Sequence, residues 1–309
     1  MAGLGVLIIV LLVLGLIGGA VGQALFGKNP ALSWLNVPTP KVELASEPVF
    51  HVGGFTVTNT LMGAWLTTIV LLAIALTIRF RLKLVPGRFQ ALMEFGMEAL
   101  LNFIESIAGH KYGRKFFPMV ATIFLFVIMN AYLGLLPFFG AIGPIDSHGV
   151  VEYGLFRAAN TDVNVPLAIA ICAFVFIEYW GIRAMGAWHY ISEFINVKQL
   201  GQGLKELFTG KVRPAVMNIV FGIVNLFVGL IELLSHFIRL VSFTFRLFGN
   251  MTAGEILIVM IAFLVPLVVG IPFYGLELLV GVIQALIFAG LTLVFATIAV
   301  GAGAEEHEH

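Results

Sequence analysis

Charged side chains are scarce in this chain of 309 residues. Only 11% of its residues are Asp, Glu, Lys or Arg, whereas 60% are hydrophobic and the mean hydropathy is +1.04. Soluble domains carry about 25% charged residues. A soluble fold would leave this much apolar surface in water, so the composition excludes one and predicts a protein of the lipid bilayer.

Cysteine and an excess of positive charge are also missing. The single cysteine, Cys172, excludes an internal disulfide framework and any multi-cysteine metal site. The 17 basic and 17 acidic residues balance, so no basic face is predicted for nucleic acid. The chain has no Gly-Lys-Ser/Thr phosphate motif, no His-Glu-x-x-His motif and no internal repeat, which argues against nucleotide chemistry, intramembrane hydrolysis and a repeat-built transporter. The Glu- and His-rich tail at 305–309 is interpreted as a solvated terminus, so we predict no metal and no cofactor.

Long apolar runs predict the membrane helices, because a helix needs about 20 apolar residues to cross the hydrocarbon core. Such runs lie at 4–26, 59–78, 116–137, 165–182, 216–265 and 274–300. The fifth run is far too long for one upright span, so it must tilt, lie partly flat or double back. We therefore expect an all-α integral membrane protein with five core membrane helices.

The first run and the segment 89–108 stand apart from this core. Run 4–26 lacks a preceding basic region and is longer than the apolar h-region of a signal peptide, which favours a retained extra helix. Its Ala20-Val21-Gly22 triplet nevertheless permits cleavage. We divide the chain into an N-terminal segment, 1–45, and a core, 46–309. In 89–108, polar residues recur every three or four positions and predict an amphipathic helix, which lies on the cytoplasmic membrane surface or packs on other subunits. A small external hairpin is predicted around Gly53-Gly54.

Basic residues set the predicted orientation, because cytoplasmic loops collect Lys and Arg. Most of them follow the second run, precede the third or follow the fourth, and only Lys28, Lys41 and Arg157 fall on the other side. This pattern places the C-terminus in the cytoplasm. The length and the lack of a transit peptide favour a multi-pass protein of a bacterial plasma (inner) membrane.

Polar side chains at membrane depth are costly, so each needs a reason. The fifth and sixth runs contain most of them: Glu232, His236, Arg239, Arg246, Asn250, Glu255, Glu277 and Gln284. Arg246 is followed by a mostly apolar stretch that reaches Leu264, and its guanidinium cannot lose its proton. Burying it costs about 2.5–3.5 kcal/mol, which predicts a functional cation. Arg239 has Glu232 and His236 within two turns of helix, which favours a structural ion pair.

Two acids of the last runs are predicted to meet. If the chain turns near Pro266 and Pro272, Glu255 and Glu277 come to a similar depth on antiparallel helices. Paired acids at low dielectric can pass protons, which favours a proton path, although both could instead face a wet outer vestibule. Glu178, near the inner end of the fourth run, could belong to a path or to the membrane interface.

One segment resembles a known family. The stretch Phe245-Arg246-Leu247-Phe248-Gly249-Asn250-Met251-Thr252-Ala253-Gly254-Glu255 is similar to the signature of subunit a of the F-type ATP synthase. Weaker similarities lie in Gly53-Gly54-Phe55-Thr56-Val57-Thr58-Asn59, in Asn160-Thr161-Asp162-Val163-Asn164 and in Gln284-Ala285-Leu286-Ile287-Phe288. Together they cover roughly residues 50–300.

The resemblance implies a role for each matching residue. Arg246 would be the essential cation facing a ring of c subunits, and Asn250, Glu255, Glu277 and Gln284 would line a half-channel open to the outside. It implies long, strongly tilted fifth and sixth helices around the ring. It also implies two offset half-channels that load and unload protons on ring carboxylates and so couple proton flow to rotation and ATP synthesis, with no catalytic chemistry in this chain. The implied partners are the c-ring, the peripheral-stalk b subunits, the remaining ATP synthase complex and the bilayer. Some members have His at one of the two acid positions, whereas this chain has Glu at both.

Overall fold

The fold is known from a computed structural model. It describes residues 2–27, 39–40, 45–83, 85–136, 139, 142–144, 154–187, 190, 201–202, 205–207 and 212–306. The end of the Glu- and His-rich tail and the predicted outer lysines Lys28 and Lys41 lie outside these residues. Two compact units divide the chain. The first comprises Met1–Met93, Thr122–Pro166 and Phe245–Phe288, and the second comprises Glu94–Ala121, Leu167–Thr244 and Ala289–His309.

Helices make up nearly all of the described structure, as the composition predicts. Five of them are long and apolar enough to cross a membrane: Asn59–Arg81, Arg88–Gly134, Asn164–Met185, Pro214–Leu264 and Leu267–Gly301. Many large apolar side chains on these helices are exposed, as a helix surface that faces a lipid bilayer requires. The chain is therefore an all-α integral membrane protein, and the predicted fold class is confirmed.

The N-terminal apolar run forms two helices instead of one. Helices α1 (Ala2–Gly18) and α2 (Ala20–Phe26) meet at a bend of 66°. A side chain at Gly15 or Gly19 would collide with the backbone carbonyls of Pro266 and Leu264, so these glycines let α1 lie directly on the turn after α8. The bend is where the predicted single helix differs from the structure.

The predicted hairpin is present and leads into the first core helix. Strand β1 (Pro48–Val52) pairs antiparallel with β2 (Phe55–Thr58). The turn between them has positive φ angles at Gly53 and Gly54, 53° and 90°, which glycine adopts without strain. Helix α3 (Asn59–Arg81) starts at once, because the Thr58 hydroxyl accepts a hydrogen bond from the Leu61 amide at 3.4 Å and caps it.

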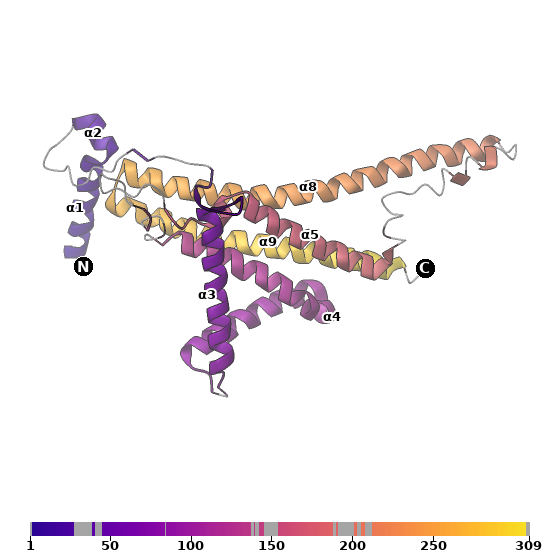
Figure 1. The fold of residues 1–309 in the computed structure, drawn as a ribbon, viewed down its shortest axis with the longest axis horizontal. Helices are drawn as coiled ribbons and strands as arrows, with labels where there is room; N and C mark the ends of the chain where they lie inside the picture. The colour runs from indigo at the N-terminus through magenta and orange to yellow at the C-terminus, as the bar shows by residue number, and fades with distance from the viewer. Residues whose placement is uncertain are drawn as a thin grey trace. The chain divides into compact units, whose positions relative to one another are not determined.

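Helix α4 (Arg88–Gly134) joins two elements that the sequence separates. The predicted amphipathic segment and the third apolar run form one element with a kink at Gly109, where φ is 71° (Figure 1). Across this kink, Glu105 contacts His110 at 2.9 Å and Arg114 at 3.2 Å. The bend thus has a glycine as its cause and a local charge cluster holding it.

Helices α5 (Asn164–Met185), α8 (Val212–Leu264) and α9 (Gly270–Glu306) complete the membrane part, with a short 3₁₀ turn, η3 (Leu267–Val269), between α8 and α9. Helix α8 is one continuous helix of 53 residues, so the fifth run does not double back (Figure 1). At 1.5 Å per residue it is about 80 Å long, more than twice the ~30 Å hydrocarbon core. In the second unit, α4 and α5 pack through an aromatic cluster centred on the buried Phe116 and on Trp180, whose rings lie 5.3 Å apart.

Candidate functional site

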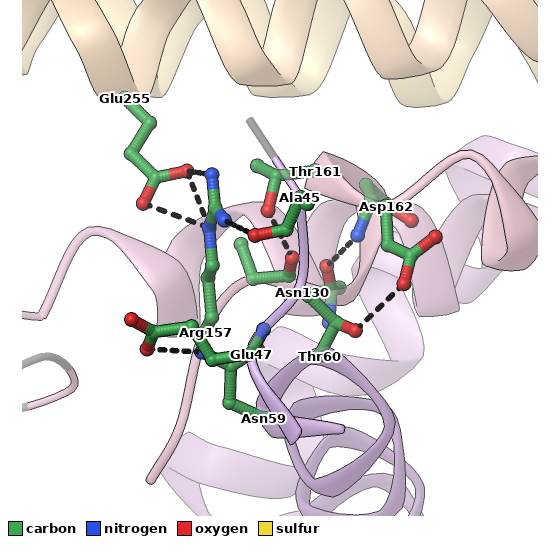
Figure 2. Close-up of polar contacts among 11 residues, drawn as sticks. Ala45, Glu47, Asn59, Thr60, Asn130, Arg157, Thr161, Asp162 and Glu255 are labelled. Carbon is green, nitrogen blue, oxygen red and sulfur yellow. Dashed lines mark hydrogen bonds and ion pairs between the residues drawn. The ribbon is translucent and has the colours of Figure 1, made fainter. Parts of the chain in front are cut away.

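A network of polar side chains in the first unit ties the start of α3 to the loop before α5 (Figure 2). The Thr60 hydroxyl donates to an Asp162 oxygen at 3.0 Å, and Asn59 and Glu47 exchange side-chain and backbone hydrogen bonds at 3.0–3.3 Å. Burial alone would raise the pKa of Asp162. Hydrogen bonds from Asn164, Ser46 and Thr60 outweigh it and lower that pKa below its ordinary value. Asp162 therefore stabilises the fold above its unfolded pKa, and this contribution is lost as the pH falls through the lowered value.

Asn130 of α4 is the buried centre of the same network. Its amide nitrogen donates to the Thr67 hydroxyl at 3.0 Å, and its amide oxygen accepts from the Asn160 backbone at 3.1 Å. Thr67 in turn donates to the Gly63 carbonyl at 2.8 Å. Asn130, Thr67 and Asn160 are fully buried. The network therefore links α3, α4 and the turn η2 (Ala159–Thr161) without help from solvent.

Asn130→Ala is expected to lower the free energy of unfolding by about 1–3 kcal/mol, because it strands the buried Asn160 amide hydrogen without an acceptor. The measurement is the thermal or denaturant midpoint of the purified complex in detergent. Thr68→Val is the matched control, since the Thr68 hydroxyl is exposed and bonds only its own helix at Ala64. Equal midpoints for Asn130→Ala and the control would contradict the assigned role.

Arg157 carries the most complete ion pair of the first unit. Its Nε lies 3.1 Å from both carboxylate oxygens of Glu255 on α8, and its Nη2 lies 3.1 Å from one of them. Its Nη1 donates to the Ala45 carbonyl at 3.2 Å (Figure 2). The arginine side chain is only 12% exposed and that of Glu255 is 38% exposed, so the pair lies at the boundary between protein interior and surface.

A cavity of about 210 Å³ lies beside this ion pair within the first unit. Its polar lining is Arg157, Thr161, Glu255, Tyr274 and Glu277, and the rest is apolar or small. Glu277 of α9 is only 7% exposed, and its carboxyl occupies the space that a side chain at Gly254 would need. The two acids predicted to come together, Glu255 and Glu277, thus line one cavity, and Gly254 is what lets Glu277 lie there.

Further polar atoms are buried in the first unit. Both side-chain atoms of Asn160 and the hydroxyl of Thr252 have no hydrogen-bond partner in the part of the chain that the structure describes. Gln284 of α9 is also buried, with 8% of its surface exposed. Buried polar groups are normally satisfied, by protein or by water, so such atoms mark positions suited to bound water.

Arg246 lies on another face of α8. Arg246, Gly249 and Asn250 are exposed, whereas Leu247, on a neighbouring face of the helix, is 1% exposed. Nothing within the described chain lies within 4 Å of the place where a Gly249 side chain would begin. Arg246 and Asn250 therefore share an exposed stripe, whereas Glu255 lines the cavity and extends from α8 toward Arg157 (Figure 2).

The second unit holds a separate cluster around Glu178 of α5. His236 of α8 approaches Glu178 at 2.7 Å and Glu232 at 3.5 Å, and the Tyr190 hydroxyl donates to Glu178. Arg239 lies with its guanidinium carbon 3.9 Å from the centre of the Phe295 ring. Glu232, His236 and Arg239, which the sequence predicts as a structural ion pair, all lie at this cluster. His236 bridges Glu178 and Glu232, and Arg239 makes a cation–π contact and acts on Glu178 through its charge.

Sequence reasoning missed Arg157, Asn130 and Tyr190 as members of these clusters. Arg157 did leave a signal, because it is a basic residue on the side where such residues are rare and it shortly precedes Asn160-Thr161-Asp162. Asn130 left the signal of a lone amide in an apolar run. Among the described residues, no group of three or more His, Cys, Asp or Glu could hold a metal.

The long apolar helices and the ionisable groups buried among them define a class, a multi-pass membrane protein with buried ionisable side chains. A family profile described as ATP synthase A chain matches residues 61–297, which is most of the chain. The chain belongs to this family.

Curated relatives agree with the family profile. ATP synthase subunit a 2 of Bradyrhizobium sp. is 29% identical over 265 residues, covering 85% of this chain and 97% of the relative. ATP synthase subunit a of Gloeobacter violaceus is 27% identical over 86% of this chain and 92% of its own. ATP synthase subunit a of Nitratidesulfovibrio vulgaris is 31% identical over 84% of this chain and 91% of its own. The chain is thus a membrane protein of ATP synthesis and proton transport.

Proposed function

We propose that this chain is the stator proton-channel subunit of the rotary ATP synthase Fo sector. The observation that carries the proposal is the cavity of the first unit, which brings two acids together, while Arg246 occupies a different, exposed face of α8. One site is suited to taking up protons and the other to meeting a partner's carboxylates. Its proposed partners are a ring of c subunits, the peripheral-stalk b subunits and the remaining complex.

The outer half-channel is assigned to the cavity with Glu255 and Glu277. Gln284 and the unpartnered atoms of Asn160 and Thr252 extend the set of polar groups that water could solvate. Asn250, exposed on the Arg246 stripe, is assigned to the end of this half-channel that meets the ring. A proton taken up here would neutralise a carboxylate on the ring. A neutral carboxyl can face lipid, whereas a charged one cannot enter it cheaply, so loading permits rotation.

Release is assigned to the inner half-channel, and Arg246 drives it. A ring carboxyl that returns to a fixed cation is stabilised in its charged form and gives up its proton. The same cation repels protons and separates the two half-channels. Each charge crossing 100 mV supplies about 2.3 kcal/mol, which turns the ring. Glu178 with His236 is assigned to the release side, while Arg239 is assigned a structural role.

The remaining assignments follow from this role. Chemistry on ATP belongs to other subunits of the complex. We place the protein in a bacterial inner membrane with its C-terminus in the cytoplasm, and we keep residues 1–45 as a segment distinct from the channel core, 46–309.

Cysteine cross-linking tests whether the Arg246 face meets the ring. In a Cys172→Ser background, Asn250→Cys is expected to form a disulfide with a cysteine scanned along the c-subunit helix, because Asn250 is exposed on the Arg246 stripe. Leu247→Cys is the matched control, three residues away on the buried face, and should give at most background cross-linking. Cross-linking of Leu247→Cys without Asn250→Cys would contradict the assigned interface.

A further inference from the structure

The two acids of the cavity have different surroundings. Glu255 has both carboxylate oxygens engaged by the Arg157 guanidinium at 3.1 Å, in the two-donor arrangement that makes Arg–carboxylate pairs strong. Arg157 is itself fixed by the Ala45 carbonyl at 3.2 Å and is nearly buried. Because an arginine stays protonated, the cation of this pair is a permanent feature of the cavity wall. The Arg157 N–H groups therefore bond to both oxygens of Glu255 and hold this carboxylate in place.

Glu277 has no such partner. In the described chain it makes no hydrogen bond and no ion pair, although it is buried and lines the same cavity. The other ionisable groups of the lining are Arg157 from the loop before η2, Glu255 from α8 and Tyr274 from α9. Helix α4 contributes only Ala131 and Gly134 to the described lining, and Leu135 and Leu136 directly after it are apolar. With Arg157 committed to Glu255, the Glu277 carboxyl is the acid of this cavity whose oxygens remain available.

We propose that the two acids have unequal roles: Arg157 is a positioning residue that holds Glu255 in a fixed ion pair, and Glu277 is the group that takes up and passes on the proton. In the step itself, a hydronium ion gives its proton to the Glu277 carboxylate and becomes water. The Glu277 carboxyl then gives that proton to a carboxylate of the c-ring and returns to its charged form. This inference rests on the proposed half-channel function and assigns its acid positions.

The pair explains why a cation is tolerated on a proton path. Neutralised by Glu255, Arg157 repels an incoming proton little, because the two opposite charges cancel at a distance. Without Glu255, the same guanidinium would be a net positive charge in the cavity or would move to the remaining acid, Glu277. Either outcome blocks uptake. Glu255 is thus required because Arg157 is present, and a variant that lacks both should not need it.

A double-variant experiment tests this dependence. Passive proton flux is measured in inverted vesicles stripped of the soluble motor, and subunit a is quantified in each preparation by immunoblot. Glu255→Gln is expected to lower the flux by about tenfold or more, since an unpaired cation changes local ion concentration on that scale. The double variant with Arg157→Gln and Glu255→Gln is expected to recover to within about threefold of wild type. Glu277→Gln should block flux alone and when added to the double variant.

The pH profile of the flux supplies a readout that a merely structural role of Arg157 would not move. In Arg157→Gln, two carboxyls share the cavity without a cation, so the flux gains a second pH-dependent step, as coupled acids titrate in two stages. Wild type and the double variant should show one step. Arg157→Lys keeps the charge with fewer donors and should show one step with flux within about threefold of wild type. If the double variant fails to assemble, the Arg157→Lys variant tests the positioning role of Arg157 in its place.

The outcomes separate this inference from the half-channel proposal. A double variant that assembles but stays as blocked as Glu255→Gln would mean that Glu255 itself carries the proton, and so would a Glu277→Gln variant with normal flux. A tenfold loss of proton flux in assembled Arg157→Lys would overturn the positioning role of Arg157. Arg246→Gln in vesicles that keep the soluble motor tests the half-channel proposal independently. Suppose that Arg246→Gln abolishes pumping but the double variant does not recover its proton flux. The half-channel proposal would then stand, and only the unequal roles of the two acids would be overturned.

Discussion

Arg246→Gln is expected to reduce ATP-driven proton pumping to background in inverted membrane vesicles, with the complex still assembled. Arg246 is exposed on α8 next to Asn250, so its loss should disturb a partner's site more than the fold of this chain. A unit charge about 4 Å from a carboxylate contributes about 4 kcal/mol at an effective dielectric of 20, or about 1000-fold in that site's proton affinity. A neutral amide lacks this effect, so ring carboxyls would keep their protons. Pumping is followed by quenching of a pH-sensitive dye.

A second signal from the same vesicles is the passive leak after the soluble motor is removed. It should rise in Arg246→Gln, because the proposed barrier between half-channels is the charge itself. Arg239→Gln is the matched control, seven residues earlier on α8. Its guanidinium lies on the Phe295 ring, so this change should cost about 0.5–2 kcal/mol of stability and leave pumping largely intact. If the assembled Arg246→Gln complex pumped at a near-normal rate, Arg246 would not be the cation that acts on the ring carboxylates.

The membrane helices could be predicted closely because they depend on strong local signals. Run 59–78 became helix Asn59–Arg81, run 165–182 became Asn164–Met185 and run 216–265 became Val212–Leu264. An apolar stretch of membrane length leaves the backbone no alternative to helix in lipid. The hairpin turn was equally local, since two adjacent glycines select its backbone geometry.

The bends and the cavity could not be predicted in the same way. The break at Gly109 and the bend at Gly19 occur at glycines in segments where many other glycines remain helical, so composition alone does not select them. Arg157 meets Glu255 across 98 positions, and Thr60 meets Asp162 across 102. Periodicity reports which face a residue occupies, but not which distant segment packs against that face. The predicted convergence of Glu255 and Glu277 needed only one turn between antiparallel helices, which is why the sequence could suggest it.

Gly63→Val is expected to cause the largest loss of folded protein. A side chain at Gly63 would overlap the backbone carbonyl of Arg157, and Gly134 similarly makes room for Ala158. The loop that carries Arg157 lies on α3 and α4 because these two residues have no side chain. Backbone cannot move aside as the end of a flexible side chain can, so the overlap should cost about 3 kcal/mol, at the upper end for overpacked cores. Displacing the loop would also break the ion pair between Arg157 and Glu255. Arg157 could then pair with Glu277 instead.

The measurement is the amount of subunit a in membranes, together with passive proton flux per assembled complex. Gly63→Val should lower both, the first several-fold because a loss of that size changes the folded fraction of a marginally stable protein. Gly96→Val is the matched control, since nothing lies within 4 Å of the place where its side chain would begin, and it carries the same change of helix propensity. It should assemble and conduct normally. Gly63→Val with normal abundance and normal flux would show that the loop adjusts to the added side chain, and the close approach at Gly63 would then not be what holds Arg157 at Glu255.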